Sequence, residues 1–224
     1  MANNRFSKKE AVKFGWEAMK GNLVFFILFL LVAWIVSGGV NFLGNPYWGP
    51  DIFFFSFFFN LLGAVVSIFI AMAVIKISLR LSAAAGETAE VSDAWSAYPF
   101  FLNYLVGSIL YGLIIIGGLI LLIVPGIIWG IKYSMFGYLI IDKEIGPVEA
   151  LKKSGEITKG FKWDLFLLGL LFLGITILGA LVCGVGLFAA IPTVLVAHAY
   201  VYRKLAYGAA VEEAPPAPQD AQQE

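Results

Sequence analysis

Charged side chains are scarce in this sequence, and the two signs are balanced. Lysine and arginine together number 15 of 224 residues, aspartate and glutamate also number 15, and 60% of the residues are hydrophobic. An average soluble domain carries about twice this share of charge, and a soluble fold of this size cannot hide so much apolar surface from water. The zero net charge also gives no attraction to nucleic acid. The composition therefore predicts a membrane protein without a nucleic-acid partner.

Cysteine and histidine are nearly absent. Cys183 is the single cysteine and His198 the single histidine, so an intramolecular disulfide is excluded and no cluster of these metal ligands is expected. For His198 we favour a hydrogen bond to a neighbouring helix over a proton-relay or metal-binding role. The sequence has no nucleophile-elbow serine, phosphate-binding loop or metalloprotease motif. We therefore expect no enzyme activity and no cofactor.

Four long stretches lack charged side chains, at residues 21–50, 52–75, 94–131 and 165–202. A membrane-spanning helix needs about 20 residues. The last stretch is nearly twice that length, so we expect it to turn back at Gly184 and Gly186, and we expect the apolar sequence 100–141 to turn back at Pro125 and Gly126. The predicted fold is all-α, a polytopic helical membrane bundle of six spans in three hairpins. The spans are expected at about 23–43, 53–81, 101–124, 126–142, 164–183 and 187–205.

Basic side chains gather on one side of these predicted hairpins. They precede the first span, close the second, fill the segment between the fourth and fifth, and end the sixth, whereas the three turns on the opposite side contain none. Basic residues in short loops stay in the cytoplasm. We therefore expect a multi-pass protein of the bacterial inner membrane with both termini cytoplasmic, ending in a disordered cytoplasmic tail at 209–224.

Two similar segments each precede a predicted hairpin. In 11–21 and 150–160, an alanine, a lysine, a glutamate, a second lysine and a glycine recur at the same spacing. In the first copy Val12, Trp16 and Met19 fall on one helical face and the charges on others, as in a helix that lies at the membrane surface. We predict amphipathic interfacial helices within the cytoplasmic segment 1–22 and at 147–162. The basic residues expected to contact lipid headgroups are Lys9, Lys13, Lys20, Lys152, Lys153 and Lys159.

Lys132 lies within the fourth predicted span, a few residues past the predicted turn at Pro125 and Gly126. A lysine at mid-membrane costs about 2.5–3.5 kcal/mol on insertion scales, and its long stem reduces this cost by reaching the headgroups. Two interpretations remain open at this stage. Lys132 contacts an anion or a phospholipid headgroup, or it only anchors the helix at the interface.

Small residues recur at four-residue spacing in the same span, at Gly126, Gly130 and Ser134. Such a pattern lets two helices approach closely in a membrane. We expect a packing seam inside the bundle here, with a homodimer interface as the alternative.

Two motifs flank the loop that follows the fourth predicted span. The first is Pro125-Gly126-Ile127-Ile128 followed by Lys132-Tyr133-Ser134, and the second runs from Gly146-Pro147 through Ser154 to Gly160. Over about residues 95–205 the chain resembles the membrane domain that precedes some bacterial glycerophosphodiester phosphodiesterases, and related stand-alone bacterial membrane proteins of uncharacterised function. The resemblance implies a helical membrane domain and no catalytic residue, because the phosphodiesterase reaction belongs to a separate soluble domain. It also implies a bulky aromatic residue after Ser154, where this chain has Gly155.

Taken together, these features predict a non-enzymatic membrane bundle that organises lipids or protein partners at the cytoplasmic face. Membrane lipids are the expected partners, alongside a second copy of the chain or another membrane protein. The alternative is a transporter of small solutes or lipids, which needs polar groups around a site near the middle of the membrane. Polar positions in or near the spans include Asn60, Asn103, Thr176 and His198.

Overall fold

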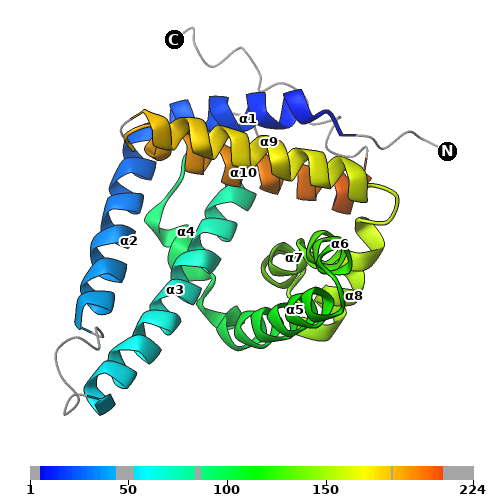
Figure 1. The fold of residues 1–224 in the computed structure, drawn as a ribbon. Helices are drawn as coiled ribbons and strands as arrows, with labels where there is room; N and C mark the ends of the chain where they lie inside the picture. The colour runs from blue at the N-terminus through cyan, green and yellow to red at the C-terminus, as the bar shows by residue number, and fades with distance from the viewer. Residues whose placement is uncertain (1–5, 44–52, 84–86, 183, 209–224) are drawn as a thin grey trace, which may run out of the picture.

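The computed structural model describes residues 6–43, 53–83, 87–182 and 184–208, and its regular elements in these ranges are all helices (Figure 1). The segment 44–52, where the predicted first hairpin turns between spans 23–43 and 53–81, lies outside the described residues, as do Cys183 and the tail at 209–224. The helices are α1 (Lys8–Gly21), α2 (Leu23–Leu43), α3 (Phe53–Leu81), α4 (Val91–Ser96), the short 3₁₀-helix η3 (Tyr98–Phe100), α5 (Phe101–Leu121), α6 (Ile123–Tyr133), α7 (Phe136–Lys143), α8 (Pro147–Ile157), α9 (Lys162–Leu181) and α10 (Leu187–Tyr207).

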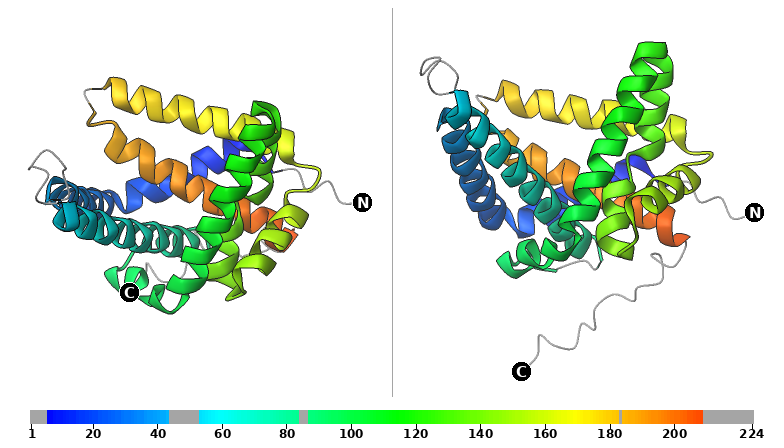
Figure 2. Two further views of the ribbon diagram at one scale, coloured as in Figure 1. Left: turned by 60° about the horizontal axis from the view of Figure 1, so that its bottom comes forward. Right: turned by 90° about the horizontal axis from the view of Figure 1, so that it is seen from below.

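The long helices pack in three pairs, α2 with α3, α5 with α6, and α9 with α10. Figure 2 shows that these pairs run in different directions and do not form one parallel bundle. Five helical segments among the described residues are long and apolar enough to cross a membrane, which is consistent with a multi-pass membrane protein. They are Leu23–Leu43, Phe54–Leu81, Tyr98–Leu121, Ile123–Lys143 and Lys162–Leu181. The predicted sixth span at 187–205 is not among them, so six crossings stay a prediction.

The helix α10 is less apolar than most of the five segments, and much of its surface contacts protein. It packs against α1, α2, α3 and α9, and Val196, Ala199 and Tyr202 are fully buried. A helix surrounded by other helices tolerates polar side chains, since those side chains find partners away from hydrocarbon. The contacts of α10 with four other helices therefore explain its mixed sequence.

The fourth predicted span, drawn as one helix over 126–142, is two helices in the structure. The helix α6 ends at Tyr133 and α7 begins at Phe136, with a break at Ser134. Every residue of α7 from Phe136 to Ile141 is buried, so this short helix forms the centre of the main hydrophobic core. The uniform apolar character of the segment hid the break, because hydropathy does not distinguish lipid contact from burial in protein.

The turn between α5 and α6 lies at Leu122, three residues before the predicted turn at Pro125 and Gly126. Leu122 has an extended backbone, with φ −170° and ψ 155°. Pro125 belongs to the first turn of α6, where a missing N–H costs no helical hydrogen bond. Gly118 and Gly126 let the two helices meet directly after this tight turn, because a Cβ at Gly118 would lie 2.8 Å from the Gly126 Cα.

The helix α1 packs lengthwise on α10 through its small residues. A Cβ at Gly15 would overlap the carbonyl oxygen of Thr193 and lie 3.0 Å from the Ala197 Cβ. The predicted apolar face with Val12, Trp16 and Met19 is therefore only partly packed on protein. The buried residues are Ala11, Gly15 and Met19, and Trp16 is exposed. Close contact between helices selects small side chains, which leaves the large indole ring on the outside.

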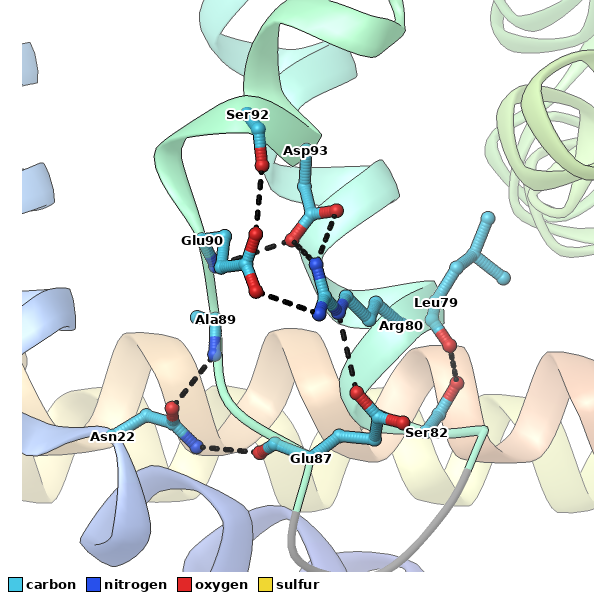
Figure 3. A network of polar contacts seen from close by, with 9 residues as sticks. All are labelled: Asn22, Leu79, Arg80, Ser82, Glu87, Ala89, Glu90, Ser92 and Asp93. Carbon is cyan, nitrogen blue, oxygen red and sulfur yellow. Dashed lines mark hydrogen bonds and ion pairs between the residues drawn. The ribbon is translucent and has the colours of Figure 1, made fainter.

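A polar network ties the end of α3 to α4 and to the junction of α1 and α2 (Figure 3). Arg80 donates to Glu87 at 3.2 Å, to Glu90 at 3.0 Å and to both carboxylate oxygens of Asp93 at 2.9 Å. The Asn22 side chain accepts from the Ala89 amide at 2.9 Å and donates to the Glu87 carbonyl at 3.3 Å. Arg80 is thus paired with three carboxylates within the protein.

Candidate functional site

Lys132 lies near the end of α6, directly beside α8. It is ten residues past the turn at Leu122, about 15 Å along the helix axis at 1.5 Å per residue. Lys132 was expected a few residues past a turn at Pro125 and Gly126; it lies instead at the far end of α6, because the turn comes earlier and α6 ends one residue after Lys132. Lys132 therefore lies on the side of the fold that carries the basic segment 147–162.

Two buried hydroxyl groups of α8 hold the backbone at the break between α6 and α7. Ser154 and Thr158 each donate to the Lys132 carbonyl oxygen at 3.0 Å, and the Met135 amide donates to the Ser154 Oγ at 3.1 Å. A helix break leaves peptide groups without helical partners, and burial makes each unpaired group costly. These hydroxyl groups satisfy them, so α8 fixes where Lys132 sits.

The Lys132 side chain runs across Gly155 of α8. A Cβ at Gly155 would lie only 2.9 Å from the Lys132 Cε. The Lys132 Nζ donates to the Tyr133 Oη at 2.9 Å and lies 4.7 Å from the centre of that ring. Gly155, which stands where the resemblance implies a bulky aromatic residue, thus leaves space for the lysine stem.

An open groove of about 710 Å³ surrounds this lysine, between α5, the end of α6, α8 and the start of α9. We call it the lysine groove. Its apolar wall is formed by Leu110, Ile114, Val148 and Leu151. Its charged residues are Lys132, Lys152, Lys159, Lys162 and Glu156.

The four lysines of this groove face a single carboxylate. None of the four forms an ion pair with a described residue, since the ion pairs of the described chain involve Lys8, Lys13 and Arg80. Lys132 is half-buried, whereas the other three are exposed. The arrangement therefore offers several ammonium groups without an ion pair beside an apolar wall, which suits an anionic group attached to an apolar one.

The predicted basic residues of α1 lie elsewhere. Lys9, Lys13 and Lys20 are exposed, and Lys13 is 3.8 Å from Glu17. Lys153 of α8 is half-buried and does not line the lysine groove. The structure therefore brings together Lys132, Lys152 and Lys159 of the predicted set, adds Lys162, and leaves the α1 lysines on a separate surface.

The predicted packing seam is divided between two surfaces. Gly126 is buried against Leu119 of α5, and the Gly130 carbonyl accepts a hydrogen bond from the Tyr111 hydroxyl at 3.0 Å. Gly130 also lines a small cavity of about 180 Å³, together with His198 and with Ser134 at the break after α6. Gly126 thus faces α5, Gly130 borders both α5 and the cavity, and Ser134 borders the cavity.

Sequence reasoning missed a polar seam between α7 and α10. The Tyr138 hydroxyl lies 3.2 Å from the His198 Nδ1, and the Tyr202 hydroxyl donates to Asp142 at 2.6 Å. His198 is therefore hydrogen-bonded to a neighbouring helix, the interpretation favoured from the sequence. Tyr138 and Asp142 are four residues apart in α7, and their partners His198 and Tyr202 are four residues apart in α10. The two helices therefore run in the same direction in matched register. Equal four-residue spacing of polar residues in two apolar segments was the available signal. No group of three or more potential metal-binding side chains occurs among the described residues.

Comparison with known proteins gives partial matches. A family model described as "Protein of unknown function (DUF975)" matches residues 109–208, which contain α6 to α10. Two uncharacterized proteins, Mb2590 of Mycobacterium bovis and Rv2560 of Mycobacterium tuberculosis, are each 30% identical to this chain over 138 residues. The match covers 62% of this chain and 42% of each relative, so the chain spans less than half the length of these curated relatives. No solved structure matches.

These likenesses carry no activity, since the family and the relatives are described only as unknown or uncharacterized. Neither comparison shows a link to the glycerophosphodiester phosphodiesterases. Together they support an uncharacterised bacterial protein family, whose matched region in this chain includes the lysine groove and the polar seam.

Proposed function

We propose that this protein is a non-enzymatic, multi-pass protein of the bacterial inner membrane that holds anionic lipid headgroups at the cytoplasmic face. In this proposal the chain crosses the membrane six times in three hairpins, with both termini in the cytoplasm. The observation that carries the proposal is the lysine groove, where Lys132, Lys152, Lys159 and Lys162 surround an apolar wall with one opposing acid, Glu156.

Electrostatics favour an anionic lipid in such a groove. A lysine near an anionic membrane surface contributes about 1 kcal/mol of attraction, and a phosphate accepts hydrogen bonds from ammonium groups at short range. Lys132 adds a fixed position to this attraction, because Gly155 and Tyr133 already hold its stem and amine. A side chain held in place loses less conformational entropy on binding than a free one.

Neutralising the groove should weaken lipid retention selectively. We expect the triple variant Lys132→Gln, Lys152→Gln, Lys159→Gln to retain about tenfold less phosphatidylglycerol than the parent protein, equivalent to about 1.4 kcal/mol. The measurement is native mass spectrometry of the full chain released from mixed micelles that contain phosphatidylglycerol and phosphatidylcholine.

A matched control removes the same charge from α1, through Lys9→Gln, Lys13→Gln and Lys20→Gln. This control should retain phosphatidylglycerol nearly as the parent does, because general surface charge alone does not make the groove. Equal losses in both triple variants, or no loss in either, would contradict a specific headgroup site. Release of a cleaved headgroup or fatty acid during incubation would contradict the non-enzymatic role.

A further inference from the structure

A second, apolar groove lies on the other side of α6. It has a volume of about 470 Å³ and lies between α6 and α9, lined by Val124, Ile127, Ile128, Ile131, Lys162, Trp163 and Phe166. We call it the α6–α9 groove. Its wall is almost wholly apolar, and its only charged lining residue is Lys162.

Lys162 lines both grooves. The lysine groove lies between α6 and α8, and the α6–α9 groove lies on the adjacent flank, so the first residue of α9 is where the two meet. The neighbouring Trp163 is 69% exposed, and exposed tryptophans lie preferentially at the level of the lipid headgroups. The charged ends of both grooves therefore share one level beside α6.

The length of the α6–α9 groove matches part of one lipid leaflet. From Ile131 to Val124 the groove follows about 10 Å of α6, against about 15 Å for half of the hydrocarbon core. Val124, Ile127 and Ile128 expose much of their surface along it. On the opposite flank, Leu110 and Ile114 of α5 extend the apolar wall of the lysine groove in the same way.

We propose that the ligand is a diacyl anionic phospholipid that straddles α6, with its phosphate at Lys132 and Lys162 and one acyl chain in each groove. The inference rests on the proposed function and adds the chemical class of the ligand. A soluble phosphate ester uses only the lysines. A lipid with a single chain fills only one of the two apolar walls. The joined grooves accommodate both chains and the charge between them.

Filling each groove without changing its charge tests the inference. Ile127→Trp occupies the α6–α9 groove, and Val148→Trp occupies the wall of the lysine groove. The control is Ile116→Trp, which places the same ring at an exposed position of α5 that lines neither groove. The probes are dioleoylphosphatidylglycerol, its single-chain lyso form and sn-glycerol 3-phosphate, each added to the full chain in detergent micelles and followed by native mass spectrometry.

We expect both groove variants to retain about fivefold less diacyl lipid than the control. An acyl chain excluded from its groove stays in the apolar micelle, so it loses only its packing contacts with the protein. The lyso form should bind more weakly to the parent and be insensitive to one of the two tryptophans. Glycerol 3-phosphate in excess should leave the bound diacyl lipid in place.

Three results would overturn the inference. Retention by Ile127→Trp equal to that of Ile116→Trp would remove the acyl chain from the α6–α9 groove. A loss with Ile127→Trp but not with Val148→Trp would mean that the lipid does not straddle α6. Displacement by glycerol 3-phosphate would assign the lysines to a soluble ligand. If the lysine triple variant still loses lipid in the first two cases, the headgroup site stands and only the placement of the acyl chains fails.

Discussion

At the scale of single residues, glycines decide which helices touch. Gly15 faces the backbone of Thr193 in α10, whereas Gly21, at the end of the same helix, has no neighbour within 4 Å of the position of an added Cβ. The two positions share a helix and a residue type but differ in packing. They therefore separate the effect of close contact from the effect of glycine on helix propensity.

Gly15→Ala should destabilise the protein by about 1–3 kcal/mol, the usual cost of an overpacked contact. Gly21→Ala should be neutral or slightly stabilising, because alanine restricts the unfolded chain without a clash. Thermal unfolding of both variants in the same detergent measures the difference. Equal melting temperatures would mean that α1 does not pack on α10 through Gly15.

A second residue-scale feature is the carboxylate of Glu90. The Arg80 guanidinium, followed by the Ser92 hydroxyl, lowers the pKa of Glu90 below its ordinary value of 4.5. A carboxyl whose pKa is lower in the folded state stabilises the fold fully above its ordinary pKa, and this contribution is lost as the pH falls through the lowered value. The Arg80 network should therefore weaken only in acid.

We expect the melting temperature of the parent protein to fall below pH 4.5, and Glu90→Gln to flatten part of that fall. The effect should be small because Glu90 is exposed to solvent. Melting curves of both proteins between pH 7 and pH 3 provide the measurement. A steeper acid loss in Glu90→Gln than in the parent would contradict the direction of the pKa shift.

At the scale of elements, hydrogen bonds from Ser154 and Thr158 of α8 hold the backbone at the break between α6 and α7. The Thr158 hydroxyl lies 2.8 Å from the Ser154 carbonyl oxygen of α8 and 3.0 Å from the Lys132 carbonyl oxygen of α6, so its single proton is shared between the two acceptors. Thr176 of α9 makes only the local bond, to the Phe172 carbonyl at 2.8 Å. Thr176→Val therefore controls for losing the hydrogen bond to the carbonyl four residues earlier, which both threonines make.

Thr158→Val should destabilise the protein by about 1–3 kcal/mol, because it leaves one contact to a buried carbonyl unmade. Thr176→Val should cost little, since the Phe172 carbonyl keeps its helical hydrogen bond. The difference between the two free energies of unfolding measures the bond between α8 and α6. Thr158→Val should also weaken the retention of phosphatidylglycerol, because the Thr158 hydroxyl helps to position Lys132. Unchanged retention would show that the position of Lys132 does not depend on this hydrogen bond.

The bounds of the helices show which features of the fold hydropathy predicts. The bounds of α2 and α3 agree with the predicted spans 23–43 and 53–81, because long uncharged stretches between charged residues leave little choice of register. The break at Ser134 and the turn at Leu122 were missed. Both depend on contacts with other helices, the first with Ser154 and the second between Gly118 and Gly126.

At the scale of the whole molecule, the proposed orientation rests on the distribution of basic residues. Cys183 is the only cysteine of the chain, and the proposed topology places it at the periplasmic surface of the inner membrane. It therefore serves as a label for that surface without any substitution.

A membrane-impermeant maleimide added to intact spheroplasts should label Cys183. The same reagent added to inverted vesicles should leave Cys183 unlabelled, because the residue then faces the vesicle lumen. The control is Cys183→Ala, which should remain unlabelled in both. Labelling only in inverted vesicles would reverse the orientation and move the lysine groove to the outer face.

The all-helical class and the apolar segments follow from the sequence alone. They depend on local composition and on the cost of placing charge in hydrocarbon, which act on each segment independently. The meeting of Lys132 with Lys152, Lys159 and Lys162, and the seam from Tyr138 and Asp142 to His198 and Tyr202, were decided only by tertiary structure. Lys132 precedes the other three lysines by at least 20 residues, and each seam pair is separated by 60 residues, so only the packing of the helices brings these groups to one place.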